Sequence, residues 1–121
     1  MSELGPYSML VAMLESLSQA DRMLLLRFVC AFAWTDLKVT DKERKFVKRL
    51  VDRFGLTGED AEDVQDWLHV APAPGSVDPS QVPAAHRRAF VETVRAMIYA
   101  DGSVDDEERA QFERLRSALS V

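Results

Sequence analysis

The fold is decided by the stretch RMLLLRFVCAFAWTDLKVTDKERKFVKRL (residues 22–50). When the chain is shifted against itself by 65 residues, this stretch falls on RRAFVETVRAMIYADGSVDDEERAQFERL (residues 87–115), and ten of the 29 positions are identical. In each copy, apolar residues at helical spacing flank a short acidic loop. Self-similarity at a fixed offset is typical of a duplicated structural unit. We therefore expect two helix–loop–helix units that pack as a pseudo-two-fold pair around one shared core.

The rest of the chain also has the pattern of helices. Apolar residues recur three and four apart, and start and stop signals such as Pro6, Ser18 and Gly55 bound the periodic stretches. The expected helices span 7–17, 18–35, 40–54, 57–68, from Pro83 or Ala84 to 99, and 105–119. Residues 70–82 hold three of the five prolines and are expected to be a linker. No segment alternates apolar and polar residues, so the prediction is an all-α, single-domain bundle of about six helices covering 1–121.

Length and composition limit the possible classes of protein. A chain of 121 residues with 47% apolar residues forms one domain with a sizeable core. The net charge of −5 gives no general attraction to nucleic acid or to anionic membranes. The most apolar segment, residues 23–34, is shorter than the ~20 residues that a membrane span needs. Without a basic N-terminal stretch typical of a signal peptide, we expect a cytoplasmic protein with no transmembrane segment.

The two inter-helix loops carry the most specific motif. The second loop reads Tyr99-Ala-Asp-Gly-Ser-Val-Asp-Asp-Glu-Glu108, and the first reads Trp34-Thr-Asp-Leu-Lys-Val-Thr-Asp-Lys-Glu43. Here the chain resembles the TerB-like (tellurite-resistance) family, which has an aromatic–Ala–Asp–Gly–x–Val/Ile–x–x–x–Glu loop between two helices. The first copy departs from this pattern, with Thr35 in place of the alanine and Leu37 in place of the glycine. If only one loop keeps the role of the family, we therefore expect it to be the second.

Helix capping explains many of the acidic residues in these loops. Thr40 with Glu43, and Asp105 with Glu108, have the spacing of a capping box, in which the first side chain and the glutamate each bind a backbone amide of the other residue. Negative charge in a first helical turn is also favoured by the helix dipole. Under this interpretation the loops are purely structural.

Metal binding is the alternative for the same residues. Asp36 and Asp101 lie at helix C-termini, where the helix dipole disfavours a carboxylate, although an Asx-turn would give each a local role. Pseudo-symmetric packing would bring the two loops together, and oxygen ligands suit Ca²⁺ or Mg²⁺. The TerB-like resemblance likewise implies metal-chelating acidic loops. The predicted ligands are Asp36, Glu43, Asp101, Asp105 and Glu108. An EF-hand is excluded, because its earlier ligand positions would fall on apolar or aromatic residues.

Two expected helices carry opposite charge. The third is basic through Lys42, Arg44, Lys45, Lys48, Arg49 and Arg53, and the fourth is acidic through Glu59, Asp60, Glu62, Asp63 and Asp66. These residues form either two solvated faces that pair with each other or a surface for an acidic partner. No glycine-rich loop, helix-turn-helix pattern or basic patch interleaved with aromatic residues points to nucleic acid.

The remaining candidates for chemistry are weak. Cys30 lies in an apolar helix, His69 at a helix end is expected to contact the helix dipole, and His86 is expected on the surface. The chain has no phosphate-binding loop and no hydrolase or zinc motif, so we expect no enzyme. The resemblance implies a protein-interaction or scaffold module in stress or tellurite resistance, with protein partners at the inner membrane face. The alternatives are a structural adaptor without metal and a carboxylate-dependent metalloenzyme such as a hydrolase.

Overall fold

The computed structural model describes residues 12–34, 39–73, 77–99 and 106–120. This part of the chain consists of helices and connecting segments without a strand, so the all-α prediction is confirmed. Residues 12–15 are helical. The longer helices are α2 (Gln19–Ala33), α3 (Asp41–Phe54), α4 (Gly58–His69), α5 (Arg87–Ile98) and α6 (Asp106–Leu119), and two 3₁₀ turns, η2 (Pro79–Gln81) and η3 (Ala84–His86), precede α5.

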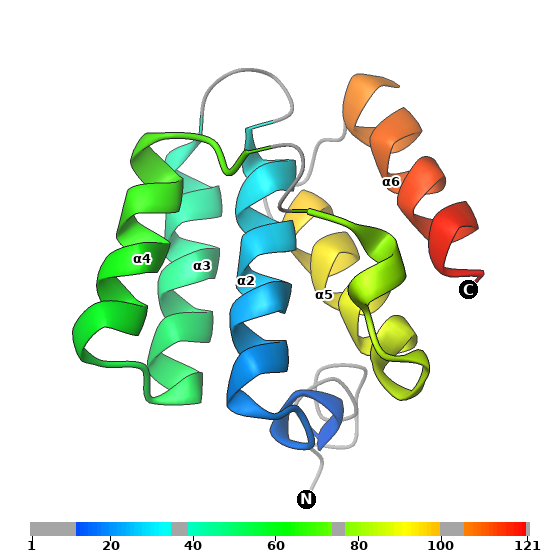
Figure 1. Cartoon of the computed structure of the whole chain (residues 1–121). Helices are drawn as coiled ribbons and strands as arrows, with labels where there is room; N and C mark the ends of the chain where they lie inside the picture. The colour runs from blue at the N-terminus through cyan, green and yellow to red at the C-terminus, as the bar shows by residue number, and fades with distance from the viewer. Residues whose placement is uncertain (1–11, 35–38, 74–76, 100–105, 121) are drawn as a thin grey trace, which may run out of the picture.

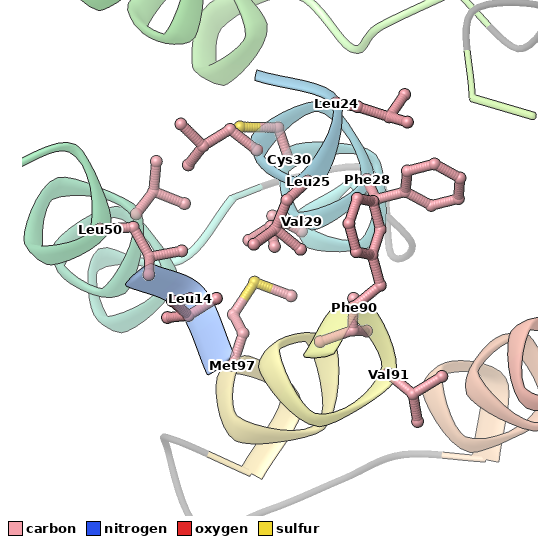
Figure 2. Packing of buried hydrophobic residues seen from close by; sticks show 14 of the residues in the cluster. Leu14, Leu24, Leu25, Phe28, Val29, Cys30, Leu50, Phe90, Val91 and Met97 are labelled. Atoms are coloured by element: carbon pink, nitrogen blue, oxygen red, sulfur yellow. The ribbon is translucent and has the colours of Figure 1, made fainter. Parts of the chain in front are cut away.

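Helix α2 is the centre of the bundle. It packs against α3, α4 and α5, while α6 packs against α5 and η2 (Figure 1). Its apolar residues are buried nearly all round, as expected for a helix enclosed by its neighbours. Figure 2 shows Phe28 and Val29 of α2 facing Phe90 and Met97 of α5, and the Phe28 and Phe90 rings meet edge-to-face with centroids 5.6 Å apart. No helix of the described residues is long and apolar enough to cross a membrane.

Local signals in the sequence set most helix ends. The Ser18 side chain accepts the Asp21 amide at 3.1 Å and so caps α2. Gly55 ends α3 with φ of 66°, a left-handed conformation that is strained for residues with a Cβ atom. Thr57 precedes α4 as expected, but its side chain makes no capping hydrogen bond.

The segment before α5 differs from its prediction. The α-helix begins only at Arg87, because the preceding residues close the tighter η3 turn, in which the His86 amide donates to the Pro83 carbonyl at 2.9 Å. The expected linker is also not simply exposed: Val82 is buried, and Val77 packs against the core. Its last six residues, 77–82, therefore belong to the packed structure.

The offset of 65 residues between the sequence copies also relates positions in the structure. Helices α2 and α5 end at residues 33 and 98, and helices α3 and α6 both span positions separated by 65 at their two ends. Buried residues follow the same offset, as in the pairs Val29/Val94 and Leu50/Leu115. Asp21 and His86, also 65 apart, lie in contact, with His86 Nε2 3.7 Å from Asp21 Oδ2. The pseudo-two-fold relation of the units stays a prediction that these correspondences favour.

Candidate functional site

The helix ends that flank the two acidic loops lie at one end of the bundle. Helices α2 and α5 end there, and α3 and α6 begin there, at the top of Figure 1. Three of the predicted metal ligands, Asp36, Asp101 and Asp105, lie outside the described residues. The topology therefore places the flanking helix ends together, and the positions of these three carboxylates stay predictions.

Glu43 is held by the helix that it caps. Its Oε1 atom accepts a hydrogen bond from the Thr40 amide at 2.8 Å, and Thr40 Oγ1 accepts one from the Glu43 amide at 3.2 Å. The side chain is 5% exposed, so this capping box is both formed and shielded from water. The capping prediction is confirmed for the first loop. One Glu43 oxygen is thereby engaged by the backbone, and its predicted role as a metal ligand is untested.

Glu108 occupies the equivalent position in α6. It is half-buried in a first turn that also contains Asp106 and Glu107, both exposed. Three adjacent carboxylates there are favoured by the positive end of the helix dipole. Among the described residues, no group of three or more His, Cys, Asp or Glu side chains is placed to hold a metal ion. A shared metal centre would therefore need the aspartates of the loops.

The two aromatic residues that open the loops have different surroundings. The Trp34 indole Nε1 donates to the Trp67 backbone carbonyl at 2.8 Å, which ties the end of α2 to α4, and the Arg27 guanidinium stacks 5.2 Å from the Trp67 ring centroid. Both tryptophans are half-buried, less enclosed than the core position expected for them. Tyr99, the counterpart of Trp34, is 52% exposed. The first loop thus begins at an anchored side chain, whereas the second begins at an exposed one.

The basic and acidic helices do not pair with each other as one interpretation of the sequence suggested. The Lys48 ammonium lies 3.3 Å from Asp52 of the same helix, and α4 uses Asp60 to accept a hydrogen bond from the Gln19 side chain at 2.8 Å. The other basic side chains of the third helix are all exposed and make no ion pair with a described residue: Lys42, Arg44, Lys45, Arg49 and Arg53. We call these five side chains and Lys48 the basic face of α3.

The remaining candidates for chemistry are structural. Cys30 is buried, and burial raises the pKa of its thiol to about 12, which disfavours the thiolate nucleophile. The His69 Nδ1 atom lies 2.8 Å from the Gln65 carbonyl within α4. The prediction that His86 is a surface residue is wrong, because its side chain is 19% exposed and packs beside Asp21 where the starts of α2 and α5 meet.

The structure also contains a groove that the sequence did not predict. It lies between α2 and α6, has a volume of about 450 Å³, and is closed at one side by Val77 and Pro79. Its floor is formed by Phe28 and Leu115, which are almost fully buried, while the Arg114 side chain is exposed at its edge. The available signal was the offset of 65 residues, which aligns Pro79 with the larger, helix-forming Leu14.

No family model, curated protein or solved structure matches the chain. The TerB-like assignment is therefore still a prediction that rests on the two loop motifs and their repetition.

Proposed function

We propose that the chain is a non-enzymatic, cytoplasmic protein-interaction module of the TerB-like type, whose acidic loops bind a divalent cation in a stress or tellurite-resistance response. The observation that carries the metal part is the common end of the bundle at which α2 and α5 end and α3 and α6 begin (Figure 1). Both acidic loops start and finish at this end. Because four carboxylates brought close together repel one another, a cation would stabilise their association.

The ligands in this proposal come mainly from the second loop. Asp101, Asp105 and Glu108 would supply carboxylate oxygens, and Asp36 would add one from the first loop. Glu43 is the least available ligand, because the Thr40 amide already occupies one of its oxygens. An oxygen-only set favours Ca²⁺ or Mg²⁺. When bound, the cation would neutralise these charges and connect the two helical units.

Isothermal titration calorimetry tests the metal site. We expect the full chain to bind Ca²⁺ or Mg²⁺, and the variant Asp36→Asn/Asp101→Asn to bind about tenfold more weakly or not at all, since affinity follows the number of charged ligands. The matched control is Asp63→Asn/Asp66→Asn, which removes the same charge from the exposed face of α4 and should bind as the wild type does. Absence of binding by the wild type to Ca²⁺, Mg²⁺, Mn²⁺ and Zn²⁺ would leave the structural adaptor as the better account.

The metalloenzyme alternative predicts an additional result. It requires the bound metal to have open coordination positions and to activate water. Metal-dependent hydrolysis of p-nitrophenyl phosphate that disappears in Asp36→Asn/Asp101→Asn, and persists in the α4 control, would support an enzyme. Binding without hydrolysis supports the interaction module.

The basic face of α3 is the surface we propose for an acidic protein partner. Its side chains are exposed along one helix, and five of the six make no ion pair with a described residue, so docking would not require internal ion pairs to break. Complementary charge accelerates association and suppresses wrong partners.

A photo-crosslinking residue at Arg49 in the source cells tests this surface. We expect a discrete crosslinked protein that is lost when Lys45→Glu/Arg53→Glu is added, and no equivalent product from the same probe at Glu113 on α6, which is exposed. As a charge control, Arg88→Glu/Arg109→Glu reverses two exposed residues elsewhere and should leave the crosslink intact. Equal crosslinking from both probe positions, or insensitivity to the charge reversal, would contradict this role for α3.

A further inference from the structure

The groove between α2 and α6 is an apolar depression with one cation at its edge. Phe28 and Leu115 form the floor, 1% and 5% exposed, and Phe32 and Ala31 of α2 continue it as half-buried residues. Arg114 is exposed at the edge and makes no ion pair with a described residue. The volume of about 450 Å³ lies within the ~300–1,000 Å³ of ligand-binding pockets.

The counterpart of this groove in the other unit is filled by the chain itself. At the offset of 65 residues, Leu115 corresponds to Leu50 and Phe32 corresponds to Met97. Figure 2 shows Leu14 between Leu50 of α3 and Met97 of α5, and Leu14 is 2% exposed. The side chain is delivered by the short helical segment 12–15 that precedes α2.

The groove is left open because a different backbone occupies the place of that helical segment. The position equivalent to Leu14 is Pro79, the first residue of the 3₁₀ turn η2, and Pro79 is only half-buried at the side of the groove. The flanking anchor is nevertheless retained, because Val82 is buried 2% exposed where the first unit has Leu17 at 4%. The second unit therefore keeps the wall of the site but not the leucine that enters it.

We propose that this groove docks an amphipathic helix of a partner protein, which inserts an apolar side chain where Leu14 lies in the first unit and places an acidic residue opposite Arg114. The filled counterpart indicates the shape of the occupant, a short helix with apolar residues three apart such as Leu14 and Leu17. The exposed Arg114 indicates its charge. This site is separate from the acidic loops and from the basic face of α3, so it does not depend on either proposal.

The test uses the full chain and a peptide with the sequence of residues 8–20, SMLVAMLESLSQA, labelled with fluorescein. This peptide carries the leucines that fill the counterpart and an acidic residue beside them. We expect saturable binding by fluorescence anisotropy. A peptide with its leucine at position 14 changed to alanine should bind at least about tenfold more weakly, since the apolar anchor dominates such interfaces.

Variants of α6 locate the binding site. Ala118→Leu extends an exposed side chain into the groove and should weaken binding at least about tenfold, whereas Ala110→Leu makes the same change outside the groove and should not. Arg114→Glu should weaken binding several-fold, and Arg109→Glu, exposed on the same helix, should not. Equal thermal unfolding midpoints of the four variants would show that folding is unaffected.

Three results would overturn the proposal. The first is no saturable binding of the peptide to the wild type. The second is binding that Ala118→Leu and Ala110→Leu weaken equally, which would place the peptide elsewhere, including in exchange for the chain's own residues 12–17. The third is a concentration-dependent dimer in sedimentation that Ala118→Leu abolishes, which would identify a second copy of the chain as the occupant.

Discussion

Replacement of Phe90 by alanine is expected to lower the free energy of unfolding by about 3–5 kcal/mol. Phe90 is 0% exposed, and its ring meets Phe28 edge-to-face at the contact between α2 and α5. Truncation removes this contact and leaves a cavity at the centre of the bundle, where the surrounding helices cannot fully close. Since small domains are stable by only about 5–15 kcal/mol, the loss is a large part of the total.

Chemical denaturation in urea, followed by circular dichroism, measures this effect. Tyr99→Ala serves as the matched control, because it truncates an aromatic residue that ends the same helix but is 52% exposed. We expect that control to change the unfolding free energy by less than about 0.5 kcal/mol. Similar losses in the two variants would mean that the α2–α5 contact is not the centre of the core.

The thiol of Cys30 is expected to react with Ellman's reagent about a thousandfold more slowly in the folded protein than in the unfolded one at pH 8. Burial raises its pKa from 9.0 to about 12, and the thiolate is the reacting species. This pKa change alone lowers the thiolate fraction by about three orders of magnitude, and steric exclusion adds to it. Rapid reaction of the native protein, without prior unfolding, would contradict the buried position.

The same pKa change predicts how stability depends on pH. Between pH 9 and about 12, the folded state keeps the Cys30 proton and the unfolded state releases it. The folded state then binds more protons, so the unfolding free energy contributed by this group falls as pH rises through that window. Below pH 9 both states hold the proton, and the contribution is independent of pH. Cys30→Ala should remove this part of the slope while leaving the contributions of other groups.

The sequence predicted the features that depend on neighbouring residues. The capping box of Thr40 and Glu43, the left-handed end of α3 at Gly55 and the apolar stripe of α2 all follow from spacing within one helix. The offset of 65 residues was also visible, and the ends of α3 and α6 obey it. These signals were sufficient for the fold class and for most helix bounds.

The sequence did not predict the features that depend on contacts between distant segments. The groove exists because Pro79 stands where the other unit has Leu14, and a single segment does not reveal which neighbours surround it. The half-buried position of His86 depends on its meeting Asp21 across the bundle. Of the candidate metal ligands, Glu43 and Glu108 lie within the described residues, and whether the loop aspartates converge depends on the packing of two helical units.

The contact between Asp21 and His86 has a consequence for the interchangeability of the two halves. These residues occupy the same position in the two sequence copies, yet one is an acid and the other a base. A hybrid chain built from two first halves would set two aspartates against each other there, and one built from two second halves would set two histidines. Neither like pair reproduces the acid–base complementarity of the present contact. At this point the halves are specialised for each other and are not modular copies.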